Sequence, residues 1–205
     1  MQAAPADEAE VSALVRDAHA AGDPVWVCGQ GSKAGLLRPV QAARTLSTRA
    51  LSGITLYSPS ELIISARAGT PVAEITRVLG ERGQHLVAEP PDFAALFETG
   101  QQQTIGGVVA TNLSGPRRVA WGAVRDHVMG VRAVNGTGEV IRAGGRVLKN
   151  VTGLDLCKLL TGSHGTLAVM TEVTIKVLPA PERRATVSPY EVGSRVPTIA
   201  TSLGP

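Results

Sequence analysis

The sequence has little of what several classes of protein require. Its only two cysteines, Cys28 and Cys157, lie far apart inside apolar segments, which disfavours a disulfide framework or a cysteine metal site. Aromatic residues make up 3% of the chain, and no apolar run reaches the ~18 residues that a membrane helix needs. Arginine and lysine give a formal charge of +3 but never form runs longer than two, which disfavours a dedicated nucleic-acid surface. The 205 residues can bury one large core or two modest ones.

The N-terminus also lacks a targeting signal. The segment MQAAPADEAE is acidic and has neither the positive nor the apolar region of a secretory signal peptide. We therefore expect a soluble, cytoplasmic protein.

Local signals in residues 1–91 predict a small α+β unit. Residues 7–21 have apolar side chains at helical spacing, with Asp7 as N-cap and Gly22 as a stop. A second helix is expected to begin at Thr70 as its N-cap. Short strands are expected over residues 24–28, 44–48, 54–57 and 62–68.

A glycine-rich loop follows the first predicted strand. Its residues are Gly29, Gln30, Gly31, Ser32 and Lys33, which offer an anion several backbone N–H groups, a hydroxyl and an ammonium. The loop also matches the dinucleotide fingerprint G-x-G-x-x-A, which requires a helix directly after the glycines and an acidic residue about 20 positions later. Pro39 interrupts such a helix, and no Asp or Glu lies between Asp23 and Glu61. We favour a phosphate-binding loop, with a Rossmann loop or a plain turn as the alternatives.

A second anion-binding loop is predicted near the middle of the chain. Its residues are Thr104, Ile105, Gly106 and Gly107, and a run of small residues follows. This pattern indicates a loop that opens a short helix. The unpaired N–H groups and the dipole of such a helix favour an anion such as a pyrophosphate.

The remaining chain predicts strands, a hairpin and a tail. Asn135-Gly136-Thr137-Gly138 is a strong hairpin signal between strands at 127–134 and 139–143. A short helix is expected over 154–160, and then a strand over 167–177 whose even-numbered residues form the wetter face. From Pro179 onward the composition shifts to Pro, Arg, Ser and Gly, which indicates a linker or tail.

Five motifs in one order carry a family resemblance. They are GQGSK, TIGGVVATNLSG, WGAVRD, VNGTGEVIRAGG and KNVTGLDLCKLLTGSHGTLAVMTEVTIKVLP. Over residues 8–181 the chain resembles the FAD-binding domains of the p-cresol methylhydroxylase and vanillyl-alcohol oxidase (PCMH) type. LSGPRR at 113–118 and VRDHVMG at 124–130 most resemble the FAD-binding subunit of bacterial glycolate oxidases, the GlcE type.

The resemblance implies an α+β fold of two subdomains, 1–91 and 92–181, with FAD between them. Residues 182–205 would be a linker or truncated tail, and the family's C-terminal cap domain would be absent. The two glycine loops would hold the pyrophosphate. Further contacts would come from Thr111, Asn112, Ser114 and Gly115 near the flavin and from Gly165 and Val169 near the adenine. The FAD would be noncovalent, because GQGSK has no His, Cys or Tyr to bond it.

The implied function is oxidation of a 2-hydroxy acid, glycolate or D-lactate, to the 2-oxo acid. Electrons would leave through partners, a second flavoprotein subunit and an iron–sulfur subunit. Two alternatives stay open: a noncatalytic organising or electron-relay module, and a reductase of the UDP-N-acetylenolpyruvylglucosamine type. No catalytic base and no metal site is identified, and His164 is expected to face solvent.

Overall fold

The computed structural model describes residues 2–36, 38–94, 96–145, 154–183, 186–188 and 198–200. The helices are α1 (Glu8–Ala21), α2 (Val72–Gly80), α3 (Ile105–Thr111), α4 (Arg118–Trp121), α5 (Val124–His127) and α6 (Leu156–Leu160). The strands are β1 (Gln2–Ala3), β2 (Val25–Cys28), β3 (Arg44–Ser47), β4 (Ile54–Ser58), β5 (Ile63–Arg67), β6 (Gln84–His85), β7 (Val128–Asn135), β8 (Val140–Gly144), β9 (Ala168–Lys176), β10 (Leu178–Pro179), β11 (Thr186–Ser188) and β12 (Thr198–Ala200). None of the helices in these ranges has the length and hydropathy needed to span a lipid bilayer.

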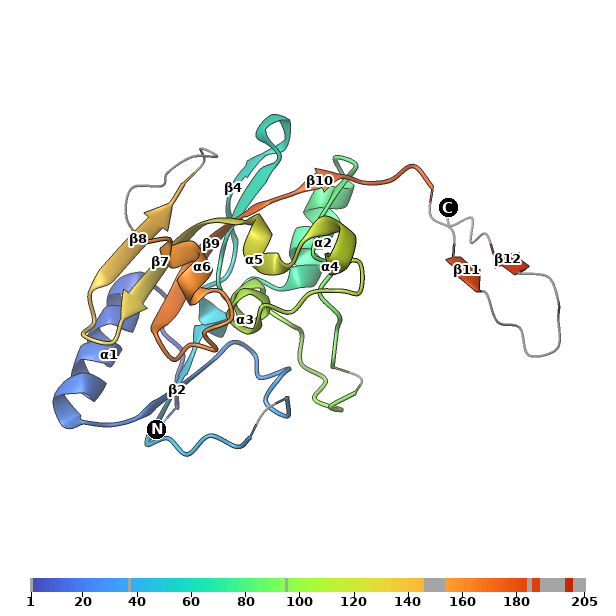
Figure 1. Cartoon of the computed structure of the whole chain (residues 1–205). Helices are drawn as coiled ribbons and strands as arrows, with labels where there is room; N and C mark the ends of the chain where they lie inside the picture. The colour runs from blue at the N-terminus through green and yellow to red at the C-terminus, as the bar shows by residue number, and fades with distance from the viewer. Residues whose placement is uncertain are drawn as a thin grey trace.

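The largest sheet has five strands in the order β4-β5-β9-β7-β8, and all its neighbours are antiparallel (Figure 1). The predicted hairpin joins β7 to β8, and Gly138 takes the positive φ of 82° that its turn requires. β4 and β5 precede residue 91 and the other three strands follow it. The sheet therefore contains strands from both sides of the predicted subdomain boundary, and the division at 91 stays a proposal.

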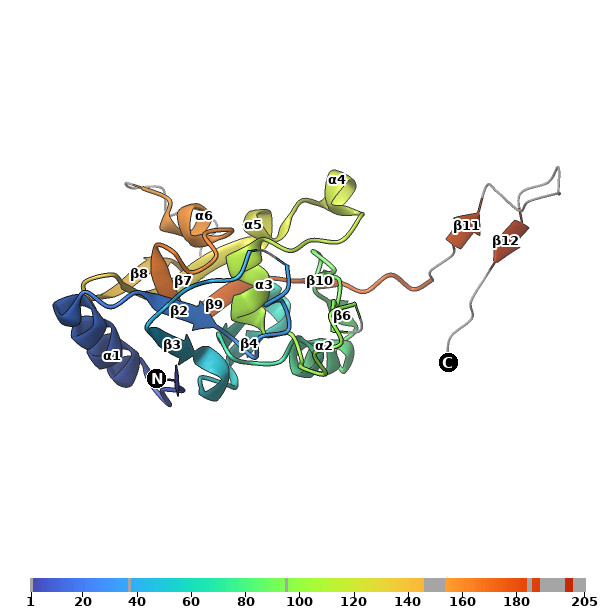
Figure 2. The ribbon, with the colours of Figure 1, turned by 90° about the horizontal axis from the view of Figure 1, so that it is seen from below.

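The main core lies between this sheet and the helices α2 and α3. Ile75 of α2, Val108 of α3 and Val173 of β9 are each about 1% exposed and belong to one hydrophobic cluster. α3 contacts β9 near the middle of the molecule (Figures 1 and 2). Burial of these apolar side chains fixes where α3 begins, and the candidate site described below depends on that position.

A second, smaller core lies under α1. Asp7 accepts a hydrogen bond from Glu10 N and Gly22 closes the helix with φ of 68°, as the sequence predicted. Val11 and Val15 of α1 pack with Val134 of β7, and Figure 2 shows α1 along this side of the body. The apolar spacing of α1 thus attaches it to the large sheet.

The small sheet has three parallel strands in the order β1-β3-β2. β2 pairs with β3 in the register Trp26↔Thr45 and runs directly into the glycine loop. A parallel strand that ends in a glycine-rich loop directs the loop's backbone N–H groups beyond the edge of the sheet. The small sheet therefore sets the position of that loop.

Two local predictions need correction. Pro71 rather than Thr70 occupies the N-cap position of α2, because the Thr70 hydroxyl bonds to Arg67 O at 2.7 Å and Gly53 N at 2.9 Å. In β9 the even-numbered residues Ala168 and Met170 are buried, so the wetter face begins only at Glu172. β9 is the central strand, with α3 packed on it and Val169 in the core under α1, so both of its faces are covered at this end.

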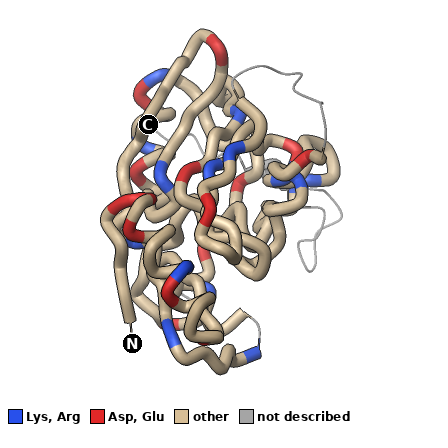
Figure 3. The backbone as a smooth tube through the Cα atoms, turned by 90° about the vertical axis from the view of Figure 1, so that its left-hand side faces the viewer, with Lys and Arg blue, Asp and Glu red and all other residues tan. Residues whose placement is uncertain are grey.

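The predicted linker or tail, 182–205, lies largely outside the described residues and stays a prediction. Within it β11 pairs antiparallel with β12. Acidic and basic residues are interspersed along the backbone in the view of Figure 3, with no long stretch of one sign.

Candidate functional site

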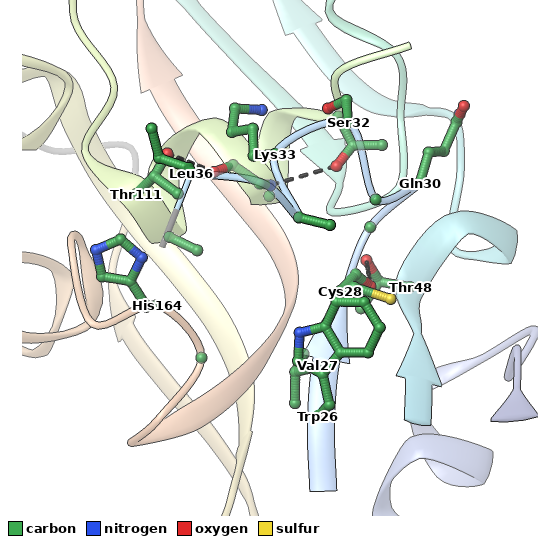
Figure 4. Close-up of a pocket in the computed structure, with 18 of the residues that line it drawn as sticks. Trp26, Val27, Cys28, Gln30, Ser32, Lys33, Leu36, Thr48, Thr111 and His164 are labelled. Atoms are coloured by element: carbon green, nitrogen blue, oxygen red, sulfur yellow. Dashed lines mark hydrogen bonds between the residues drawn. The ribbon is translucent and has the colours of Figure 1, made fainter. Parts of the chain in front are cut away.

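A cavity of about 840 Å³ lies where the two predicted anion loops meet. This volume is within the range of about 300–1,000 Å³ that is usual for small-molecule sites. Its wall comes from β2, the glycine loop, the start of α3 and the segment from His164 to Met170 (Figure 4). Three stretches that lie far apart in the sequence therefore line one cavity: β2 with the glycine loop, the start of α3, and the segment from His164 to Met170.

The two loops touch through Gly29 and Thr104. A Cβ atom placed on Gly29 would overlap Thr104 Oγ1 and lie 3.3 Å from Thr104 Cγ2. Thr104 is 2% exposed, and its Oγ1 accepts a hydrogen bond from Gly107 N at 3.3 Å as the N-cap of α3. The absence of a side chain at Gly29 thus allows the cap of α3 to pack against the glycine loop.

The glycine pair at the start of α3 has two different roles. Gly106 packs inward, since a Cβ on it would lie 2.7 Å from Ala68 Cβ, and its N–H donates to Ala68 O at 2.8 Å. Gly107 faces the cavity, where a Cβ would lie 3.6 Å from Lys33 Nζ. Gly106 therefore seats the helix, and Gly107 leaves room between the helix and the Lys33 ammonium.

Lys33 is the ionisable group at this junction. Burial disfavours its charged form and lowers the pKa of Lys33 to about 8, and the opposing effect of Asp92 is smaller. A lysine held in this way gains from a bound anion, which favours the ammonium form. Lys33 is therefore the candidate ligand for a negatively charged group at this junction.

The charges of the wall have one sign. In the described part of the chain the wall includes Lys33, Arg38 and His164 but no Asp or Glu. Gly31 adds backbone at φ of 81° with nothing within 4 Å of where its Cβ would be, so the loop presents its main chain to open space. Such a cavity suits an anionic ligand with an extended shape.

The structure places ten of the predicted site residues on the cavity wall. They are Gly29, Gln30, Gly31, Ser32, Lys33, Thr104, Gly106, Gly107, Thr111 and Gly165. A Cβ on Gly165 would lie 3.2 Å from Val27 Cβ, so this glycine brings the segment before β9 against β2. Which of the ten contact a cofactor stays a prediction.

Five predicted residues do not line the cavity. Ile105 is 1% exposed in the main core, and Val169 packs under α1. Asn112 accepts from Arg125 N at 3.1 Å and Ser114 from Val124 N at 2.9 Å, so both tie the end of α3 to α5. Gly115 packs on backbone, because its N–H donates to Ala88 O at 2.7 Å. Ile105, Gly115 and Val169 are buried, whereas Asn112 and Ser114 are half-buried just after the end of α3. Contact of these five residues with a cofactor stays a prediction.

Several wall residues were not singled out from the sequence. They include Trp26, Cys28, Thr48, Ala68, Ala110 and Met170. Val25 and Val27 pack toward the core under α1. Because side chains of a strand alternate between its two faces, the sequence could have indicated that Trp26 and Cys28 lie on the opposite face of β2. His164 is exposed, as expected, but it also lies at the cavity wall. Its backbone N–H donates a hydrogen bond to Ala110 O at 2.8 Å.

Comparison with known proteins decides the family. Residues 1–144 match the model of the family described as "FAD binding domain". This chain belongs to that family. The resemblance seen in the sequence and the α+β FAD-binding fold are thereby confirmed.

Individual relatives agree with this assignment. The chain is 47% identical over 165 residues to glycolate oxidase subunit GlcE of Escherichia coli (strain K12), which covers 80% of this chain and 45% of that protein. It is 32% identical over 176 residues to a D-lactate dehydrogenase of Archaeoglobus fulgidus, covering 85% and 38%. A solved structure of an alkyldihydroxyacetonephosphate synthase superposes with a TM-score of 0.67 and 26% identity, covering 88% of this chain and 32% of that one. The chain thus spans less than half the length of these relatives.

The residues present fit the diphosphate of FAD, which the family implies. The Lys33 ammonium and the Ser32 hydroxyl lie on a wall without carboxylates in the described residues, beside a glycine whose Cβ would enter the space next to Lys33. The same wall continues to apolar residues of β2 and β9, which suit the flat rings at the ends of a dinucleotide.

Proposed function

We propose that this chain is the FAD-binding part of an oxidoreductase that oxidises a 2-hydroxy acid, glycolate or D-lactate, and passes the electrons to a partner subunit. The observation that carries the proposal is the cavity where the glycine loop and the start of α3 meet around Lys33. FAD, when bound, supplies the two-electron redox chemistry, and the protein supplies binding and orientation.

The choice of substrate rests on the relatives. The printed names of two of them are a glycolate oxidase subunit and a D-lactate dehydrogenase, and both substrates carry a hydroxyl next to a carboxylate. The name of the first also supports a multisubunit assembly, in which we place a second flavoprotein subunit and an iron–sulfur subunit.

The residues of this chain divide the work of holding the cofactor. Lys33 and the backbone of the glycine loop neutralise and bind the diphosphate, and this FAD is held without a covalent bond. Thr104 fixes the start of α3, and Thr111 secures its last turn by donating to Gly107 O at 2.8 Å. We assign no general base to this chain, because the described wall has no carboxylate and its histidine is exposed.

The proposal is tested by assaying glycolate and D-lactate with an artificial electron acceptor. The chain is assayed alone and together with co-expressed partner subunits. Reduction of the acceptor that requires both this chain and its FAD supports the proposal. Lys33→Met in the same assembly is the matched control, because it alters cofactor retention and leaves the partners intact. An assembly that oxidises both acids equally well without this chain contradicts the proposal.

A further inference from the structure

Trp26 is a large aromatic side chain that neither hydrophobic cluster of the described residues includes. Val25 and Val27, its neighbours in β2, pack against the core under α1, whereas Trp26 is half-buried on the wall of the cavity. An indole ring gains more from burial than most side chains do, so its place outside both cores requires another partner.

Strand geometry explains which way the ring points. Successive side chains of β2 alternate between its two faces, so Trp26 shares a face with Cys28 and lies opposite the two valines. Figure 4 shows the indole ring beside Cys28 and Thr48, on the far side of the cavity from α3. The ring therefore forms part of the surface that a ligand would meet.

The distance along the strand suits a nucleotide. Trp26 precedes Gly29 by three residues, which at a rise of about 3.3 Å per residue separates their Cα atoms by about 10 Å. A ligand whose phosphates lie at Lys33 reaches back along β2 through a sugar unit. The group that then meets Trp26 is a flat ring.

We propose that Trp26 is the stacking surface for a planar ring of the bound dinucleotide, either the purine or the isoalloxazine. This inference rests on the proposed function, since it names a positioning residue for the same cofactor. Stacking on an aromatic face is favourable for either ring because each presents a π-face. Met170, which is 5% exposed, adds apolar surface to the same wall.

The test measures equilibrium binding of FAD, ADP and FMN to the full chain and to variants of Trp26. We expect Trp26→Ala and Trp26→Leu to weaken FAD binding by about 5- to 100-fold, the range that loss of one stacked base produces. Trp26→Phe keeps a ring and retains most of the affinity, whereas leucine keeps apolar bulk without a π-face. Weaker ADP binding identifies the purine as the stacked ring, and weaker FMN binding identifies the isoalloxazine.

Trp121→Leu is the matched control. This second tryptophan of the chain contacts Arg117 and His85 and is absent from the described cavity wall, so its replacement leaves FAD affinity unchanged. FAD binding by Trp26→Leu that equals binding by the unaltered chain overturns the proposal. If Trp26→Ala fails to fold, the comparison of leucine with phenylalanine decides. If Trp26→Leu and the unaltered chain bind FAD equally well, the stacking proposal fails while the proposed function stands. If the unaltered chain binds no nucleotide at all, both fail.

Discussion

Replacing Gly29 by alanine tests the contact between the two anion loops directly. The new methyl group would overlap Thr104 Oγ1 and come within 3.3 Å of Cγ2, at a threonine that is only 2% exposed. Overpacking of this kind costs about 1–3 kcal/mol. Displacing Thr104 also weakens the cap of α3, worth about 1 kcal/mol.

Together these effects lower the free energy of unfolding by about 2–4 kcal/mol. For a chain of 205 residues, each kcal/mol shifts the melting temperature by about 2–4 °C, so Gly29→Ala should melt about 4–16 °C lower. The cost arises from one identified clash, so a second substitution should relieve it.

Thr104→Ala provides that relief. It removes the overlapping oxygen and leaves Thr104 Cβ 3.4 Å from the new methyl group, an ordinary contact. Thr104→Ala alone loses the cap, but in the Gly29→Ala background the cap is already weakened and Thr104→Ala also removes the clash. The double variant should therefore be more stable than the sum of the single effects by about 1–2 kcal/mol.

The assay is urea unfolding of the four proteins of this cycle, followed by circular dichroism. Gly80→Ala is the control, because Gly80 is helical and nothing lies within 4 Å of where its Cβ would be. This control should not lose stability, since alanine favours a helix by up to about 1 kcal/mol. Single effects that add within about 0.5 kcal/mol would refute the packing of Gly29 on Thr104.

Three further predictions concern the junction at Lys33. Lys33→Met should weaken FAD and ADP binding by about 10- to 100-fold, through loss of a charge-assisted hydrogen bond, in a titration against the exposed control Lys158→Met. Burial lowers the pKa of Lys33 from 10.5 to about 8, so the folded state loses this proton at a lower pH than the unfolded state does. The free energy of unfolding should therefore rise between pH 8 and 10.5. Urea unfolding at several pH values measures this rise, and Lys33→Met should abolish it. Gly107→Val should abolish FAD retention, because the valine side chain enters the space 3.6 Å from Lys33 Nζ. Gly80→Val is the control and should retain the cofactor, because nothing lies within 4 Å of where the Cβ of Gly80 would be. Equal FAD content in the two variants would contradict the placement of the cofactor beside Gly107.

Local structure could be predicted because its signals lie within a few residues. Asp7 and Gly22 delimit α1, and Asn135 to Gly138 turns β7 into β8, as the sequence indicated. These positions depend on caps and positive φ angles, which neighbouring residues determine. The same holds for the glycine loop after β2.

Contacts between distant segments could not be predicted. Gly29 and Gly106 stay predicted phosphate contacts, but their local sequence did not show that they also make room for Thr104 and Ala68. Ile105 and Val169 stay predicted cofactor contacts, but their neighbours in the sequence did not show that the packing of α3 and α1 on β9 buries their side chains. Pairing of β5 with β9 joins residues more than a hundred positions apart, and no local pattern encodes it.

The central claim is that this chain holds FAD in the cavity around Lys33. The most direct test is the absorption spectrum of the purified chain, followed by heat release and identification of the chromophore. We expect a flavin spectrum, FAD freed into the supernatant because it is not covalently bound, and a much lower FAD content in Lys33→Met. A folded, colourless chain that takes up no added FAD would contradict the account.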